Sequence, residues 1–128
     1  MARGNNMESP NKFEPGPLHV FHALKAALNG FREAWKYEDA FRQELFVAAI
    51  AIPFALLCDV GTVGKILMVA STLLVLILEL VNSAVEAAVD HTSLDQHPFA
   101  KRAKDIAGAA VLLSMGNMLF VWGMVLFA

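Results

Sequence analysis

The stretch from Ile66 to Asp90 constrains the fold of this chain more than any other. It carries no charge from Ile66 to Leu78 and then continues as ELVNSAVEAAVD. At helical spacing the polar residues of this second part fall on one face, while valines and leucines occupy the opposite face. The polar stripe consists of Glu79, Asn82, Ser83, Glu86 and Asp90. The stretch therefore predicts a membrane-grade helix with carboxylates along one side.

Ionised carboxylates on such a helix need a physical reason. Near the centre of a membrane helix each costs about 3 kcal/mol, whereas each Ile, Leu or Val returns about 0.3–0.6 kcal/mol. The helix inserts comfortably only if Glu79 and Glu86 lie near an interface, face protein or bind a cation. The simpler alternative is a pair of interfacial carboxylates that ends the span. We favour a functional stripe because Asn82 and Ser83 share the same face and because ionisable groups in membrane helices mark functional sites.

Composition supports a membrane protein. The chain has 128 residues, of which 57% are hydrophobic and 17% are charged. A soluble domain of this length has no core large enough to bury so much apolar surface. Cys58 is the single cysteine, so neither an internal disulfide nor a cysteine-based metal site is expected. We predict one all-α integral membrane domain over residues 18–128.

The N-terminal part divides into a tail and an amphipathic helix. Residues 1–17 are polar and rich in proline, which predicts a disordered cytoplasmic tail. Over residues 18–37 apolar side chains recur every three or four positions with basic residues between them. This pattern favours a helix that lies in the headgroup layer, anchored by Trp35 and Tyr37. The alternative, a soluble packing helix, has no soluble core to join.

Three apolar segments follow, predicted as spans over about 40–58, 66–89 and 104–127. Pro53 is expected to kink the first span without ending it. Asp59–Lys65 contains two glycines and is predicted as a tight polar turn. The second connection is expected as a loop that runs from Asp90 into the basic segment AKRAKD. The chain is uncharged from Ile106 to its last residue.

The distribution of basic residues predicts the orientation. Of the ten Lys and Arg residues, six lie before or at the start of the first span, Lys65 lies in the turn, and three lie at the start of the third span or just before it. The positive-inside rule then places the N-terminus and the second loop in the cytoplasm. The carboxylates of the stripe approach that cytoplasmic side.

Acidic and basic groups are thus expected to meet at the cytoplasmic ends of the spans. Carboxylate and amide oxygens suit Mg²⁺, which takes one or two carboxylates plus substrate phosphates. Lysine and arginine suit a polyphosphate, although basic residues after a span also serve as topology signals. The sequence contains no P-loop, Gly-rich dinucleotide motif or protein-kinase motif. A carboxylate, metal and phosphate site at headgroup level favours phosphoryl transfer to a lipid.

Three segments resemble the prokaryotic diacylglycerol kinases, a family that includes undecaprenol kinases. They are EDAFRQE from Glu38, ELVNSAVEAAVD from Glu79 and HPFAKRAKD from His97, and their order and spacing match from about Lys25 onward. The resemblance implies a homotrimeric bundle in the bacterial inner membrane, with active sites shared between subunits. It also implies MgATP as cosubstrate and phosphatidic acid as the product made from diacylglycerol. No nucleic-acid partner is expected.

Carried over residue by residue, the resemblance implies that Glu79 is the general base that takes the proton from the lipid hydroxyl. It implies that Glu38 and Glu86 hold the metal ion and the nucleotide with it. The further nucleotide contacts that it implies are Asp95, Gln96, His97, Lys104 and Asp105. The lipid site that it implies comprises Arg32, Trp35, Phe41, Arg42, Gln43 and Glu44, together with Glu79 and Asn82, which orients the reacting group.

Two questions stay open at this stage. The acceptor is diacylglycerol or, alternatively, undecaprenol, because the stretch AALN before Gly30 and the residues Lys101 and Gly108 depart from frequent family residues. A different class, a small oligomeric channel or transporter with Glu79, Asn82 and Glu86 along its path, is the competing interpretation. A membrane scaffold without chemistry is the third. The absence of charge from Ile66 to Leu78 argues against a charged path through the membrane.

Overall fold

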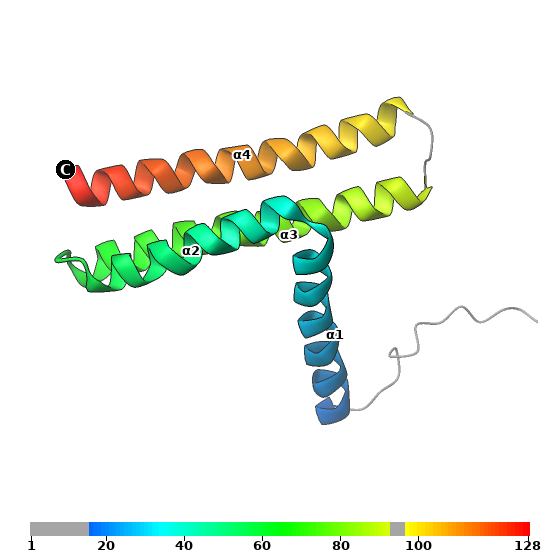
Figure 1. The fold of residues 1–128 in the computed structure, drawn as a ribbon, viewed down its shortest axis with the longest axis horizontal. Coiled ribbons are helices and arrows are strands. Elements are labelled where there is room, and N and C mark those ends of the chain that lie inside the picture. The colour runs from blue at the N-terminus through cyan, green and yellow to red at the C-terminus, as the bar shows by residue number, and fades with distance from the viewer. Residues whose placement is uncertain (1–15, 93–96) are drawn as a thin grey trace, which may run out of the picture.

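The structure, a computed structural model, describes residues 16–92 and 97–128 and folds them into helices. These are α1 (Gly16–Tyr37), α2 (Asp39–Leu57), α3 (Thr62–Thr92) and α4 (Pro98–Phe127), and the described residues include no strand. Helices α2, α3 and α4 run side by side, and α1 leaves this bundle at a steep angle (Figure 1). The prediction of an all-α fold is confirmed.

Three of the helices have the length and composition of membrane spans, namely α2, α3 and α4. At 1.5 Å of rise per residue, the 31 residues of α3 extend about 46 Å, beyond a hydrocarbon core of about 30 Å. Helices α3 and α4 run past the point where α1 departs (Figure 1). The three predicted spans are confirmed, and the protruding part of α3 carries the end of the polar stripe. The position of α1 in the headgroup layer stays a prediction.

The α2–α3 turn is shorter than predicted. Helix α3 begins at Thr62 rather than Ile66, so the residues from Thr62 to Lys65 are helical and the turn occupies the four positions before them. Helix α2 continues through Pro53 to Leu57, as expected. At the other end of the chain, Gly16 and the residue after it belong to α1 rather than to the predicted tail, and residues 1–15 lie outside the described residues.

The α4 helix begins earlier than predicted. Pro98 occupies its first turn, where a missing N–H costs nothing, and His97 caps the helix by accepting a hydrogen bond at Nδ1 from the Phe99 amide at 3.2 Å. The basic segment predicted as a loop is therefore helical. Lys101 and Lys104 accordingly project from successive turns of a fixed element.

The interior between the spans is built from small and medium side chains. Ala48 and Ala55 of α2 and Met68 and Val75 of α3 are buried. The buried Thr72 hydroxyl donates to the Met68 carbonyl at 2.8 Å, which satisfies it within its own helix. Large apolar side chains on the outer faces of α2 and α4 are exposed within one chain. Those faces are suited to lipid or to a neighbouring copy.

We call the end where α2 turns into α3 and where α4 ends the distal end of the bundle (Figure 1). The Trp122 indole nitrogen of α4 donates to the Met68 carbonyl and to the Thr72 hydroxyl, both at 3.2 Å, and its ring stacks on Phe54. A Cβ at Gly64 would lie 2.9 Å from Cγ1 of Val125. Glycine at this position is what allows α3 and α4 to approach.

We predict that Gly64→Ala destabilises the protein by about 1 kcal/mol, because overpacking against a β-branched side chain outweighs the better helix propensity of alanine. Unfolding by SDS in a mild-detergent background measures the effect. Gly61→Ala is the control, since no atom lies within 4 Å of its added Cβ. Val125→Ala should rescue Gly64→Ala, and failure of that rescue would contradict the packing argument.

Candidate active site

The first part of the polar stripe of α3 is buried against protein, whereas Glu86 is half-buried and Asp90 is exposed. Glu79 is 4% exposed, and Asn82 and Ser83 are each 9% exposed. The Asn82 side-chain amide donates to the Glu86 carboxylate at 3.3 Å, and the Ser83 hydroxyl donates to the Glu79 carbonyl at 2.9 Å. These bonds tie the stripe together along one helix. Glu79 is thereby held as a carboxylate that neighbouring helices shield from lipid.

Two further carboxylates approach the stripe from the start of the chain. Glu44 of α2 lies close enough to Glu79 for their charges to interact. Glu38, at the junction of α1 and α2, interacts with Glu86 and Asp90. The Glu44 Oε2 atom and the Asn82 Oδ1 atom are buried acceptors without a hydrogen-bond partner among the described residues. The cluster is thus rich in oxygen acceptors and short of donors.

The electrostatics of Glu38 follow from this arrangement. Burial raises the pKa of its carboxyl group above the ordinary glutamate value, and the negative charges of Glu86 and Asp90 raise this pKa further. A carboxylate beside other carboxylates resists ionisation unless a positive charge joins them. The junction is therefore an electrostatically strained acidic site that a cation would relieve.

Basic groups reach the same region from α4. The Lys104 ammonium pairs with the Asp90 carboxylate of α3 at 2.9 Å, and Lys101 pairs with Asp105 within α4 at 2.6 Å. The Arg102 guanidinium lies over the Phe99 ring, on which the His97 imidazole also stacks. Of the predicted nucleotide contacts, the structure thus brings Lys104 to the stripe. Asp95 and Gln96 lie outside the described residues.

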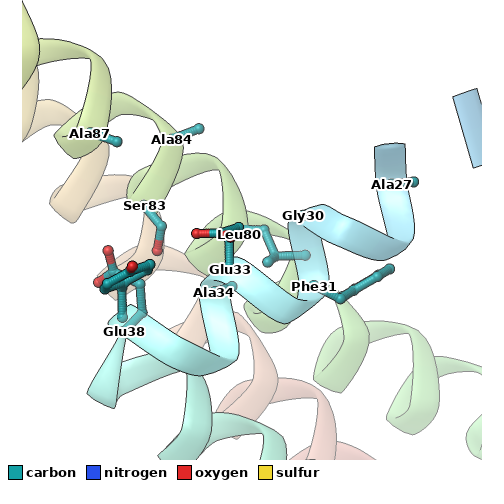
Figure 2. A pocket seen from close by; sticks show the side chains of 11 residues that line it. Ala27, Gly30, Phe31, Glu33, Ala34, Glu38, Leu80, Ser83, Ala84 and Ala87 are labelled. Atoms are coloured by element: carbon teal, nitrogen blue, oxygen red, sulfur yellow. The ribbon is translucent and has the colours of Figure 1, made fainter. Parts of the chain in front are cut away.

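A pocket of about 580 Å³ lies between α1 and α3 (Figure 2). Most of its lining is apolar. The lining residues are Ala27, Gly30, Phe31, Glu33, Ala34, Tyr37, Glu38, Leu80, Ser83, Ala84 and Ala87. In Figure 2 the labelled Glu38 and Ser83 side chains turn toward the same end of the pocket. Through Ser83 the pocket therefore reaches the polar stripe of α3.

The residues expected at a lipid site are distributed differently. Glu38 lines the pocket, whereas Arg32 and Trp35 of the same region are exposed and outside its lining. Phe41 is 2% exposed and belongs to the interior, and Gln43 is exposed. The Arg42 guanidinium donates to the carbonyls of the last α1 turn. Glu38 thus belongs to the pocket wall, whereas Arg32 and Trp35 lie on the outer face of α1.

Of the lining residues, only Glu38 was assigned to a site from the sequence, and the polar ones left unassigned are Glu33, Tyr37 and Ser83. The signal was present in the small residues Ala27, Gly30 and Ala34, which share one face of α1 at helical spacing. They face the alanines of α3, so the two helices leave an apolar space between them. Charge and aromatic patterning drew attention to the opposite face instead.

The oxygen atoms of Glu38, Glu86 and Asn82 suit a metal ion that a phosphate ligand also coordinates. Within residues 16–92 and 97–128, three or more His, Cys, Asp or Glu side chains do not converge into a complete cation site. Glu38 and Glu86 form an acidic pair, and Asn82 has a spare buried oxygen. Two carboxylates completed by substrate phosphates form the arrangement that Mg²⁺ prefers. The chemistry therefore fits Mg²⁺ that arrives with a polyphosphate.

Comparison with known proteins decides the family. Residues 25–126 match the family of prokaryotic diacylglycerol kinases. The chain belongs to this family. The family match begins within α1 and continues almost to the end of α4, so it includes the junction, the stripe and the basic start of α4.

Individual relatives of this prokaryotic diacylglycerol kinase family agree with the match. A diacylglycerol kinase of Pseudomonas aeruginosa is 41% identical over 118 residues, covering 92% of this chain and 96% of the relative. One from Haemophilus influenzae is 41% identical over 112 residues, covering 88% and 95%. One from Escherichia coli K12 is 35% identical over 113 residues, covering 88% and 93%. The similarity thus extends over nearly the whole length of each protein.

We predict that Glu38→Gln stabilises the protein at neutral pH when divalent cations are chelated. Because the folded-state pKa of Glu38 is raised, ionising this group weakens the fold as the pH rises through that value. Below the ordinary glutamate pKa of about 4.3 the group is protonated in both states, so the advantage of the variant should vanish. SDS unfolding in EDTA over this pH range measures the difference.

Asp59→Asn is the matched control, since Asp59 is an exposed acid in the α2–α3 turn, away from the cluster. It should show little change at any pH. A stabilisation by Glu38→Gln that is equal at acidic and neutral pH would contradict the electrostatic explanation.

Proposed function

We propose that this chain is an ATP- and Mg²⁺-dependent lipid kinase that phosphorylates the primary hydroxyl of diacylglycerol to give phosphatidic acid. One observation carries the proposal: a mainly apolar pocket includes Glu38 and Ser83 in its lining, and Ser83 belongs to the α3 stripe that carries the buried Glu79 and, through Asp90, an ion pair with Lys104. Family membership supplies the reaction class, since the relatives named above are diacylglycerol kinases.

The pocket supports a lipid acceptor. Its volume of about 580 Å³ is within the usual range for small-molecule sites, and its walls are mainly apolar with a few polar groups at one end. Acyl chains suit the apolar wall at Leu80, on the membrane side of the pocket, and a hydroxyl headgroup suits the polar lining at Glu38 and Ser83. An acceptor held in this way enters from the membrane, so the protein needs little soluble mass.

Glu79 is the residue that we assign as general base. Its carboxylate accepts the proton of the lipid hydroxyl while the hydroxyl oxygen bonds to the γ-phosphorus of ATP. The bond from that phosphorus to the β,γ-bridging oxygen breaks, and ADP leaves with the electron pair. Because phosphoryl transfer is mainly a matter of positioning and charge stabilisation, the protein supplies orientation and electrostatics rather than covalent chemistry.

Glu38 and Glu86 are the residues that we assign to Mg²⁺. When bound, the ion supplies charge neutralisation for the phosphates at the acidic junction. Asn82 is bonded to Glu86 and keeps one oxygen unpaired, which suits orientation of the reacting groups. Lys104 is the proposed phosphate contact, with His97 and Asp105 on the same helix end, and Asp95 and Gln96 complete the proposed nucleotide set.

We further propose a homotrimer in the bacterial inner membrane with the N-terminus in the cytoplasm. The excess of Lys and Arg before α2 and at the start of α4 supports this orientation. Large apolar residues such as Leu112, Leu113 and Phe120 of α4 are uncovered within one chain, which supports association through the outer faces. Association would also close the open side of the pocket.

The direct test is an assay of the purified protein in mixed micelles with ATP and Mg²⁺. We expect transfer of the γ-phosphoryl group to diacylglycerol, measured as labelled phosphatidic acid. Undecaprenol is the competing acceptor and is assayed in parallel. Preferential phosphorylation of undecaprenol would overturn the acceptor, and phosphorylation of neither lipid would overturn the lipid-kinase proposal. Ion flux through reconstituted vesicles without lipid phosphorylation would instead support a channel.

We predict that Glu79→Gln lowers turnover by roughly 10²–10⁴-fold, the usual contribution of a general base. The apparent affinities for MgATP and lipid should change little, because the lost interaction belongs mainly to the transition state. Initial rates measured while each substrate concentration is varied in turn give the turnover number and the two apparent affinities. Normal turnover in Glu79→Gln, or a defect confined to MgATP binding, would assign the base to another residue.

A further inference from the structure

A single residue joins the first two helices. Helix α1 ends at Tyr37 and α2 begins at Asp39, so Glu38 alone forms the corner at which the chain turns steeply (Figure 1). The backbone of Glu38 is extended, with φ −117° and ψ 103°. The Glu38 amide donates to the Ala34 carbonyl at 3.0 Å, and its carbonyl accepts from the Arg42 amide at 3.2 Å. These bonds leave the Trp35 and Lys36 carbonyls at the end of α1 for a side chain to satisfy.

Arg42, one turn into α2, reaches back to this corner. Its Nη1 atom donates to the Trp35 carbonyl at 2.8 Å and to the Lys36 carbonyl at 3.3 Å. Its Nη2 atom pairs with the Asp39 carboxylate. The last carbonyls of a helix have no partner within that helix and lie at the negative end of its dipole. A guanidinium here therefore satisfies the end of α1 and ties it to α2.

The Glu38 side chain does not cap α2. Glu38 occupies the N-cap position of α2, where an acidic side chain commonly accepts a hydrogen bond from the first-turn amides. No side-chain cap bond forms at this position. The Glu38 carboxylate instead lines the pocket and interacts with Glu86 and Asp90 of α3. The corner is held from Arg42, not from Glu38.

We infer that Arg42 is a positioning residue that fixes the α1–α2 corner and thereby holds Glu38 toward α3. It also keeps the small-residue face of α1 against α3, which gives the pocket its wall. This role is carried by the bonds to the Trp35 and Lys36 carbonyls and does not depend on a contact between Arg42 and a substrate. The effect of Arg42 on kinetics rests on the proposed function, whereas its effect on the direction of α1 at the corner does not.

The chemistry of the corner requires arginine specifically. A planar guanidinium carries donors on separate nitrogens, so it can serve two carbonyls and a carboxylate at once. A lysine ammonium has three donors on a single nitrogen, so it cannot reproduce the two separated nitrogens that face the α1 carbonyls and the Asp39 carboxylate. The Arg42 side chain is 37% exposed and Asp39 is 81% exposed, so the exposed ion pair contributes less than the bonds to the α1 backbone.

Pulsed EPR distances test the corner directly. Spin labels are placed at Leu18→Cys on α1 and Val63→Cys on α3, both exposed positions, in a Cys58→Ser background. Labelled protein is diluted with unlabelled protein so that pairs within one chain dominate. We expect a narrow distance distribution with Arg42 present and a broad, shifted one in Arg42→Gln. Lys25→Gln, which removes the same charge elsewhere on α1, should match the parent.

Kinetics supply the second readout. In Arg42→Gln we expect the acceptor KM and the half-saturating Mg²⁺ concentration to rise about tenfold, the usual consequence of losing a charged hydrogen bond. Turnover with both at saturation should fall much less. Arg42→Lys should lie between the parent and Arg42→Gln in both readouts, which keeps the test valid if Arg42→Gln does not fold.

An unchanged, narrow distance distribution in the Arg42 variants would overturn the inference. An equal kinetic loss in Lys25→Gln would do so too, because the charge rather than the corner would then matter. A loss of turnover without change in the Mg²⁺ requirement or the acceptor KM would place Arg42 at the reacting groups instead. If the parent protein phosphorylates no lipid, the proposed function fails, and the EPR distances still decide the role of Arg42.

Discussion

The cost of placing carboxylates on an apolar helix governs the rest of this structure. Glu79 is almost fully buried, and a buried charge is tolerated only with partners or with a cation. Groups from the other helices surround this stripe. Helix α2 brings Glu44 close to Glu79, the α1–α2 corner adds Glu38, and Lys104 of α4 pairs with Asp90. The stripe thus organises acidic and basic groups around itself.

The division of labour at the α1–α2 corner shows how a short chain places a functional side chain. A terminal helical turn and the following N-cap both need hydrogen-bond partners. In this protein the Arg42 guanidinium donates to carbonyls at the end of α1, and the Glu38 side chain forms no cap bond at the start of α2. An acidic group that would otherwise stabilise its own helix is presented to α3. Arg42 therefore stabilises the corner, while the nearby Glu38 contributes its carboxylate to the site.

The fold was predictable because apolar length and periodicity alone define spans and helices. The stripe was predictable for the same reason, since helical spacing places Glu79, Asn82 and Glu86 on one face. The start of α4 was predicted too late, because the cap formed by His97 depends on a backbone amide that composition does not reveal. The role that we infer for Arg42 was not predictable from the sequence either, because the groups that accept its hydrogen bonds are main-chain carbonyls. The pocket depends on small residues, which carry little sequence signal individually.

The length of α3 has a consequence for the membrane in which this protein works. About 20 helical residues cross a hydrocarbon core, so a span that begins at Thr62 reaches its far boundary near Val81, between Glu79 and Glu86. The boundary between acyl chains and water therefore falls along the stripe itself. A thicker bilayer would draw Glu86 toward hydrocarbon, and a thinner one would wet Glu79. Bilayer thickness thereby becomes a physical variable of the site, adjusted at a small cost per ångström of mismatch.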